Sequence, residues 1–182
     1  MTRTVLVPIA DGTEEIEAVC IIDVLRRAGS EVIVASIGAD KSIIASRGVK
    51  LTADIHISEC AGKVFDLIAL PGGMPGAEHL RDSELLTEML KHQAKAGRLY
   101  AAICASPAVV LQHHGLLENK KATSYPAMQK KLDNPQTDIV VVDGNCITSQ
   151  GVGTALEFAL KLVELLFDSE KANEVAVSIL KA

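Results

Sequence analysis

Short apolar runs rich in β-branched residues alternate along the chain with longer segments in which apolar residues recur every three or four positions. The short runs are typical of strands buried on both faces, and the longer segments are typical of amphipathic helices. The runs predict strands over residues 4–9, 31–36, 66–70, 99–103, 138–142 and 146–148, and a pair of short strands within 42–51 that turns near Arg47 and Gly48. The periodic segments predict helices over residues 14–28, 83–96, 106–113, 154–167 and 169–180.

This alternation predicts an α/β fold, in which a mostly parallel sheet carries helices on both of its faces. The 182 residues contain no linker, repeat or low-complexity stretch, so we expect one domain over residues 1–182. Functional sites in such folds form at the carboxyl ends of the strands. The segments at those ends are residues 10–17, 71–76, 104–107 and 149–153.

Composition and charge exclude several classes of function. Aromatic residues make up only 3% of the chain and the net charge is −5, so a nucleic-acid partner is not expected. No apolar run is long enough to span a bilayer and no leader precedes the first strand, which predicts a soluble cytoplasmic protein with no membrane partner. The four cysteines form no CxxC pair, so we expect free thiols rather than disulfides or a metal site.

Cys104 is the cysteine that lies between a predicted strand and a predicted helix. Its neighbours are small, as in a nucleophile elbow, where a sharp strand-to-helix turn exposes one side chain. Pro107 suits the first turn of the following helix. Since the N-terminus of a helix favours a thiolate, we expect Cys104 to be a reactive thiolate. The alternative is a buried structural cysteine, and we keep that interpretation for Cys20, Cys60 and Cys146.

Glu17 falls on the apolar arc of the helix predicted over residues 14–28, between Val24 and Ala28. Burial of a carboxyl group raises its pKa, so Glu17 is expected to hold a proton near neutral pH. A protonated carboxyl can donate a hydrogen bond to a thiolate without adding a second negative charge. The alternative is that Glu17 reaches solvent at the edge of the helix.

A glycine-rich loop follows the strand that ends at Leu70. One N–H group from this loop and one from Ala105 could together form an oxyanion hole. A phosphate-binding loop is excluded because no Gly-Lys-Ser/Thr follows. Residues 150–154 are a second candidate wall, although ordinary turn glycines are the alternative for both segments. A histidine base is not evident, because His113 would lie roughly 13 Å from Cys104 along the same helix.

Five motifs stand out along the chain: Glu14-Glu15-Ile16-Glu17, Ser46-Arg47-Gly48, Leu70-Pro71-Gly72-Gly73, Ala101-Ala102-Ile103-Cys104-Ala105 and Thr148-Ser149-Gln150-Gly151-Val152-Gly153-Thr154. In the same order and at similar spacing over nearly the whole chain, they resemble those of the ThiJ/PfpI superfamily. They look closest to its parkinsonism-associated branch of protein deglycases and glutathione-independent glyoxalases. The resemblance implies a flavodoxin-like three-layer sandwich, similar to class I glutamine amidotransferases.

The resemblance also implies roles for individual residues and a homodimer. Cys104 matches the reactive cysteine of the family, Glu17 its protonated glutamate, and Gly73 the glycine that supplies a backbone N–H. Arg47 matches an arginine near the pocket and the dimer contact, and Tyr125 stands where animal members carry a histidine. The dimer is expected through the helix over residues 14–28, whose second apolar side contains Ile16 and Val19. Scattered surface hydrophobic residues are the alternative.

The activity that the resemblance implies is cysteine-dependent detoxification of reactive carbonyls without a cofactor. The substrate would be a small reactive aldehyde such as methylglyoxal, which would be converted to lactate. A glycated protein or nucleotide is the other implied substrate. Ala105 replaces the histidine of the protease-like branch, and the late His-x-Glu of glutamine amidotransferases is absent. Neither of those activities is therefore expected. The alternatives are a redox sensor and oxidation-activated chaperone, with Cys104 oxidised to a sulfinate, and a binding module without turnover.

Overall fold

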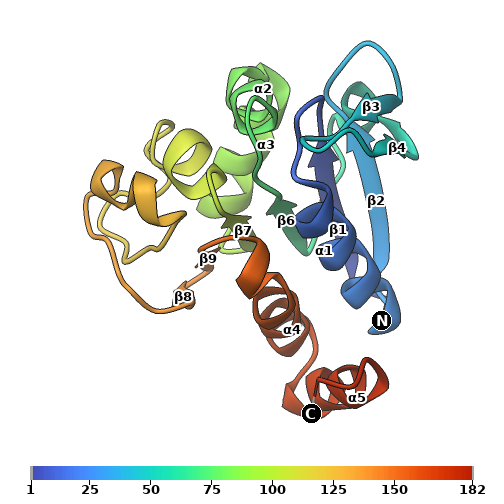
Figure 1. Ribbon diagram of the computed structural model, residues 1–182, viewed down its shortest axis with the longest axis vertical. Helices are drawn as coiled ribbons and strands as arrows, with labels where there is room; N and C mark the ends of the chain where they lie inside the picture. The colour runs from blue at the N-terminus through green and yellow to red at the C-terminus, as the bar shows by residue number, and fades with distance from the viewer. Residues whose placement is uncertain (1, 182) are drawn as a thin grey trace.

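A seven-stranded sheet forms the middle layer of the protein in the computed structural model, which describes residues 2–181 (Figure 1). The strands are β1 (Thr4–Ile9), β2 (Glu31–Ser36), β3 (Ser42–Ile44), β4 (Lys50–Thr52), β5 (Ile55–His56), β6 (Leu67–Leu70), β7 (Leu99–Ile103), β8 (Val140–Asp143) and β9 (Cys146–Ser149). The α-helices are α1 (Glu15–Arg27), α2 (Gly76–Asp82), α3 (Glu84–Lys95), α4 (Ala155–Leu166) and α5 (Ser169–Ser178). Shorter helical turns cover Ile57–Cys60, Pro107–Leu111, Pro126–Lys131 and Val152–Thr154.

The strand order in the sheet is β5-β2-β1-β6-β7-β9-β8, and every neighbouring pair is parallel except β8 with β9. β3 and β4 form a separate antiparallel hairpin. The carboxyl ends of β1, β6, β7 and β9 therefore lie side by side at one edge. Those ends lead into the four segments where the sequence places its candidate site.

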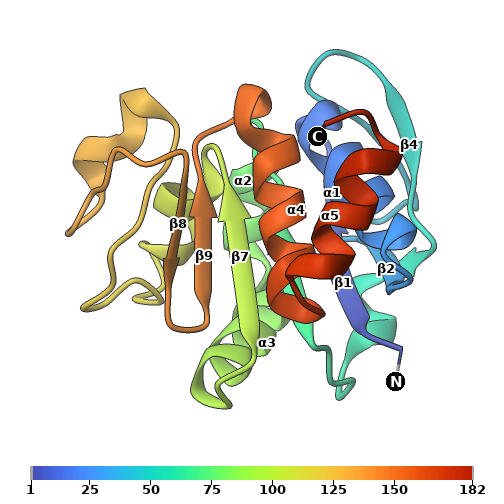
Figure 2. The ribbon, with the colours of Figure 1, turned by 90° about the horizontal axis from the view of Figure 1, so that it is seen from below.

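Helices cover both faces of the sheet, as alternation along β1 requires. Val5 and Val7 pack with residues of α1 and α4, whereas Leu6 points to the opposite face and packs with residues of α2 and α3. Figure 2 shows α4 in front of the strands and α3 behind them. The predicted α/β fold with a mostly parallel sheet is confirmed.

The helix predicted over residues 106–113 is present, but it is shorter and more widely wound than an α-helix. It is a π-helical turn over Pro107–Leu111, in which the Gln112 N–H donates to the Pro107 carbonyl over 2.8 Å. All five residues of the turn are buried in the core. Two elements, α2 and β5, were not predicted, because each is too short to show a period.

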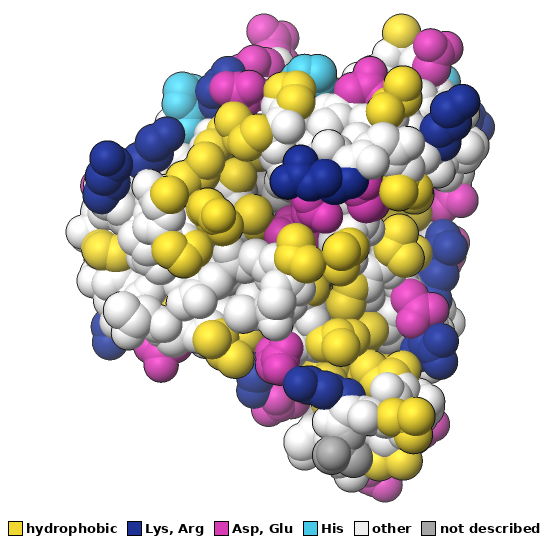
Figure 3. Space-filling model, viewed as in Figure 1, with side chains coloured by type: hydrophobic (Ala, Val, Ile, Leu, Met, Phe, Trp, Pro, Cys, Tyr) yellow, Lys and Arg dark blue, Asp and Glu magenta, His cyan; other side chains and the backbone are white. Residues whose placement is uncertain are grey.

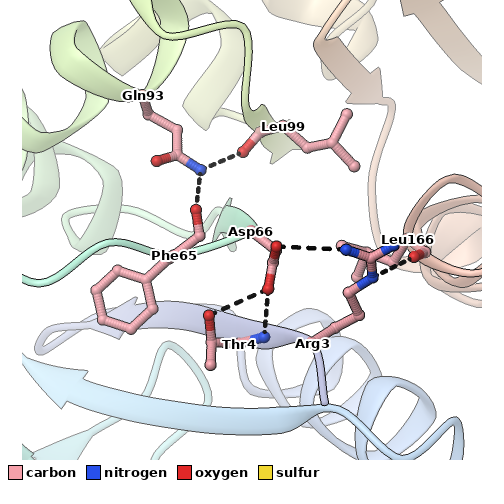
Figure 4. A network of polar contacts seen from close by, with 7 residues as sticks. All are labelled: Arg3, Thr4, Phe65, Asp66, Gln93, Leu99 and Leu166. Atoms are coloured by element: carbon pink, nitrogen blue, oxygen red, sulfur yellow. Dashed lines mark hydrogen bonds and ion pairs between the residues drawn. The ribbon is translucent and has the colours of Figure 1, made fainter. Parts of the chain in front are cut away.

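Side chains join the strands at the amino edge of the sheet, opposite the candidate site (Figure 4). Asp66 accepts hydrogen bonds from the Thr4 N–H at 2.8 Å and from the Thr4 hydroxyl at 3.2 Å. The buried Gln93 amide donates to the carbonyls of Phe65 and Leu99, which precede β6 and begin β7. Three central strands are thus fixed relative to one another at this edge.

The outer side of α1 remains apolar and exposed. Ile16 and Val19 lie at the surface together with Leu156 of α4. Hydrophobic side chains gather over α1 and α4 in the space-filling view (Figure 3). The homodimer expected through this helix stays a prediction. Within residues 2–181, none of the helices combines the length and apolar character that crossing a membrane requires.

Candidate active site

Cys104 occupies a strained turn between β7 and the π-helical turn. Its φ is +63°, in the left-handed region that residues other than glycine rarely adopt. Two backbone hydrogen bonds fix the turn: the Cys104 N–H donates to the Ser149 carbonyl at 3.0 Å, and the Tyr125 N–H donates to the Cys104 carbonyl at 2.7 Å. The side chain is half-buried and lines a cavity. The expected elbow is therefore present, and Cys104 is not fully buried, whereas its reactivity stays a prediction.

Glu17 lies in the first turn of α1 and is completely buried. The Gly72 N–H donates to its Oε2 at 2.8 Å. The start of α1 is anchored to the same loop, because the Glu14 N–H donates to the Gly72 carbonyl at 2.9 Å. The alternative in which Glu17 reaches solvent is wrong.

The other carboxyl oxygen, Oε1, has no nitrogen or oxygen partner among residues 2–181. The Cys104 thiol is its neighbour, because a Cβ at Gly151 would lie 3.9 Å from both Cys104 Sγ and Glu17 Oε1. A buried polar atom without a partner is costly, so a proton between Oε1 and the sulfur would satisfy both groups.

Two glycines allow this close arrangement. A Cβ at Gly72 would lie 2.6 Å from the Cys104 Cβ and 2.9 Å from Glu17 Oε2, so no side chain fits there. Gly73 has a φ of +90°, and its Cβ would lie 2.3 Å from the Gly12 carbonyl oxygen. The loop after β6 therefore brings its backbone directly against the sulfur and the carboxyl group.

The electrostatics of the pair depend on one shared proton. Burial raises the pKa of the Glu17 carboxyl from 4.5 to about 7, although the hydrogen bonds from Gly72 and Cys104 oppose that shift. Burial and the neighbouring Glu17 carboxylate raise the pKa of the Cys104 thiol, whereas the N–H groups of Gly73 and Ala105 lower it. Two adjacent negative charges are unfavourable. A thiolate at Cys104 therefore requires that Glu17 keeps its proton.

The groups that favour a thiolate differ from the expected ones. The sequence predicts the N-terminus of a helix behind Cys104, but the π-helical turn there is only five residues long. The N–H groups of Gly73 and Ala105 lower the pKa of the Cys104 thiol, but burial and the Glu17 carboxylate outweigh them and raise that pKa overall. A reactive thiolate at Cys104 therefore stays a prediction.

The raised pKa of Glu17 predicts that folding stability falls as pH rises from 4.5 to 7. In this window the unfolded chain has released the Glu17 proton, while the folded chain still holds it, so the folded state binds more protons. The free energy of unfolding of Glu17→Gln minus that of wild type should increase by about 3 kcal/mol between pH 4.5 and pH 7, because each pH unit contributes about 1.4 kcal/mol. Urea unfolding of both proteins at pH 5.0 and 7.5 measures this difference. A difference that does not change with pH would contradict the assignment of a proton to Glu17.

Arg47 and Tyr125 lie at the rim of the cavity. The Ser46–Arg47 turn is held against α1, because the Ser46 hydroxyl lies 2.6 Å from Glu14 Oε2 and the Arg47 N–H donates to Glu15 Oε1 at 2.9 Å. The Arg47 side chain is exposed, and that of Tyr125 is about half exposed. The cavity has a volume of about 610 Å³. It brings together all six predicted site residues: Glu17, Arg47, Gly73, Cys104, Ala105 and Tyr125.

Sequence reasoning missed two contributors to the site. Gly72 was recognised as part of a glycine-rich loop but not as the donor to Glu17, and Ser46 was not recognised as the contact that attaches the hairpin turn to α1. Both act through partners more than 30 positions away in the chain. Only the fold brings these partners together.

Comparison with known proteins places this geometry in a family. The family model described as "DJ-1/PfpI family" matches residues 3–165. Protein DJ-1 homolog B of Arabidopsis thaliana is 53% identical over 98% of this chain, which covers 41% of that protein, and homolog A is 48% identical with 47% covered. The chain thus spans less than half the length of these two relatives.

Other relatives match along most of their length. Glutathione-independent glyoxalase DJR-1.2 of Caenorhabditis elegans is 37% identical over 94% of this chain and 91% of its own. The solved structure described as "Toxoplasma gondii DJ-1, oxidized" superposes with a TM-score of 0.98 at 51% identity, with both chains covered completely. The predicted resemblance is confirmed: the chain belongs to the DJ-1/PfpI family.

Proposed function

We propose that this protein converts methylglyoxal to lactate by cysteine-dependent chemistry that needs neither glutathione nor another cofactor. The observation that carries the proposal is the pairing of Cys104 with the buried Glu17 carboxyl inside one cavity. The relative in Caenorhabditis elegans that is named a glutathione-independent glyoxalase supports it. Early glycation adducts of proteins or nucleotides are further candidate substrates, because the carbon that the thiol would attack derives from the aldehyde carbon of methylglyoxal.

The residues suit each step of the reaction. The Cys104 thiolate adds to the aldehyde carbon, and the oxygen of the resulting hemithioacetal is held by the Gly73 and Ala105 N–H groups and receives the Glu17 proton. The Glu17 carboxylate then removes the hydrogen of that carbon as a proton, which leaves an enediolate. Glu17 returns this proton to the neighbouring carbon, and the hydroxyl proton moves from the first oxygen to the second, so that a thioester of lactate forms. Water hydrolyses the thioester, releases lactate and restores the thiolate. One carbon is oxidised and its neighbour is reduced, so no external oxidant is needed.

The direct test is lactate formation from methylglyoxal by the purified chain, with no glutathione or metal added. We expect lactate to accumulate in proportion to protein concentration and to match the methylglyoxal consumed. Consumption of methylglyoxal without lactate would indicate simple trapping by surface side chains, and it would reject the proposed reaction.

A redox-sensing role is the second candidate, favoured by the position of Cys104 and by a relative described as oxidized. Two successive reactions with hydrogen peroxide would convert the thiolate to a sulfenate and then to a sulfinate, each releasing water. An oxidised Cys104 that activates a chaperone function belongs to the same proposal.

We expect mild peroxide to add two oxygen atoms to the Cys104 peptide before the other cysteines react. Cys60 and Cys146 are buried. Cys20 lies outside the cavity, and burial with the nearby Asp23 and Glu157 raises the pKa of its thiol to about 11. Within the part of the chain that the structure describes, no backbone N–H group lowers that pKa as Gly73 and Ala105 do at Cys104. Peptide mass spectrometry over a peroxide series measures the order of oxidation. Simultaneous oxidation of Cys20 and Cys104 would reject selective sensing.

A further inference from the structure

The loop after β9 passes directly over the thiol and its carboxyl partner, and Gly151 is its point of closest approach. The backbone of Gly151 is extended, with φ of 161°, so other residues can adopt it. A Cβ at this position would lie 3.9 Å from Cys104 Sγ, 3.9 Å from Glu17 Oε1 and 3.7 Å from Tyr125 Cδ2. These are ordinary van der Waals distances. A methyl group would therefore fit without strain and would fill the space between the three side chains.

The loop cannot easily withdraw from this position. The Gly151 carbonyl accepts hydrogen bonds from the Thr154 N–H at 2.9 Å and from the Thr154 hydroxyl at 3.0 Å. The Thr154 and Ser149 hydroxyl oxygens lie 2.7 Å apart, and the Ser149 carbonyl accepts from the Cys104 N–H. The position of Gly151 relative to the sulfur is thus fixed by hydrogen bonds at both ends of the loop.

A carbonyl compound that reacts at Cys104 must approach the sulfur and Glu17 Oε1 together. Reacting atoms meet at about 3 to 3.5 Å before the bond forms. The side toward Gly72 is closed, because even a Cβ there would lie 2.6 Å from the Cys104 Cβ. The open region equidistant from Sγ and Oε1 is the one that a side chain at position 151 would occupy.

We infer that Gly151 is a specificity-determining residue: its missing side chain leaves the opening through which an electrophilic carbon reaches Cys104. The backbone of Gly151 also limits the size of the substituent that this carbon can carry on the side that faces the loop. The confined space suits an aldehyde carbon, which carries a hydrogen there, better than a ketone carbon with a second carbon substituent. The inference rests on the proposed function for its enzymatic readout only, since access to the sulfur can be measured without turnover.

The test compares Gly151→Ala and Gly151→Val with Gly153→Ala. Gly153 lines the same cavity, but a Cβ there would lie more than 4 Å from Cys104 Sγ. Gly153→Ala therefore reports the effect of a methyl group that is added to this loop away from the sulfur. Iodoacetamide measures access to the sulfur, because its methylene carbon bonds to Cys104 Sγ as iodide leaves. Intact-protein mass spectrometry gives the alkylation rate, and peptide mapping confirms that Cys104 is the alkylated residue. We expect the rate to fall about 10-fold in Gly151→Ala and about 100-fold in Gly151→Val. Hydrogen peroxide, which is smaller, should be slowed less.

The outcomes separate this inference from the proposed function. Equal alkylation rates in wild type, Gly151→Ala and Gly153→Ala would overturn the inference. If Cys104 of the wild-type protein is alkylated, if Gly151→Ala slows that alkylation, and if the wild-type protein is nevertheless inactive on methylglyoxal, the proposed function is rejected and the inference is upheld. Thermal unfolding of each variant verifies that it is folded, and Gly151→Ala keeps the test decisive if the valine variant does not fold.

Discussion

Cys104→Ser is expected to abolish lactate formation from methylglyoxal, with a loss of at least about 1,000-fold in kcat/KM. A serine hydroxyl at this position would stay protonated, because a carboxylate with a pKa of about 7 is too weak a base to ionise it. The N–H groups of Gly73 and Ala105 would remain in place but would have no covalent intermediate to hold. Enzymatic lactate determination with a protein blank measures the loss.

Cys60→Ser provides the matched control for the loss of a thiol. Cys60 is buried in the core on the α3 side of the sheet, outside the cavity, so this variant should keep the wild-type rate if it folds. Lactate formation that persists in Cys104→Ser would show that the chemistry takes place elsewhere. It would also remove the basis for assigning Glu17 a role in proton transfer.

Glu17→Gln and Glu17→Ala are expected to lower lactate formation by about 1,000-fold for different reasons. The glutamine can accept the Gly72 hydrogen bond and donate an N–H to the sulfur, so its thiolate should form readily. It has no proton to exchange with the substrate, so the rearrangement should stop at the hemithioacetal. The alanine leaves the buried Gly72 N–H without an acceptor, and it removes the donor to the sulfur as well.

Alkylation of Cys104 distinguishes the two variants. We expect iodoacetamide to react with Glu17→Gln at least as fast as with wild type at pH 7, although turnover is lost. Slow alkylation in Glu17→Gln, in step with the loss of activity, would mean that Glu17 only maintains the geometry of the pocket. In that case proton transfer would have to be assigned to another group.

The parts of the site that the sequence predicted correctly are those with a local signature. Cys104 stands between a buried strand and Pro107, and Glu17 interrupts an apolar arc, so each could be recognised within a few residues. Since parallel strands end at one edge, the segments carrying Gly73 and Ala105 were expected near them. The cavity confirms that expectation.

The parts that the sequence did not predict depend on contacts between distant segments. The α2 helix has only seven residues, and its three buried positions, Gly76, Ala77 and Leu80, are too few to establish a period from the sequence. The segment after Cys104 is apolar on all sides, so a π-helical turn and an α-helix give the same pattern. The contacts of Gly72 with Glu17 and of Ser46 with Glu14 each join separate loops, and no spacing within either loop reveals them.

The side-chain contacts at the amino edge have a consequence for engineering. Asp66 and Gln93 join the central strands at the edge opposite the cavity. The loops at the carboxyl edge are therefore not the only connections that keep these strands in register. Libraries that vary positions such as 125, 150 and 152 could thus be screened for new substrates on a scaffold whose strand order is secured at its far edge.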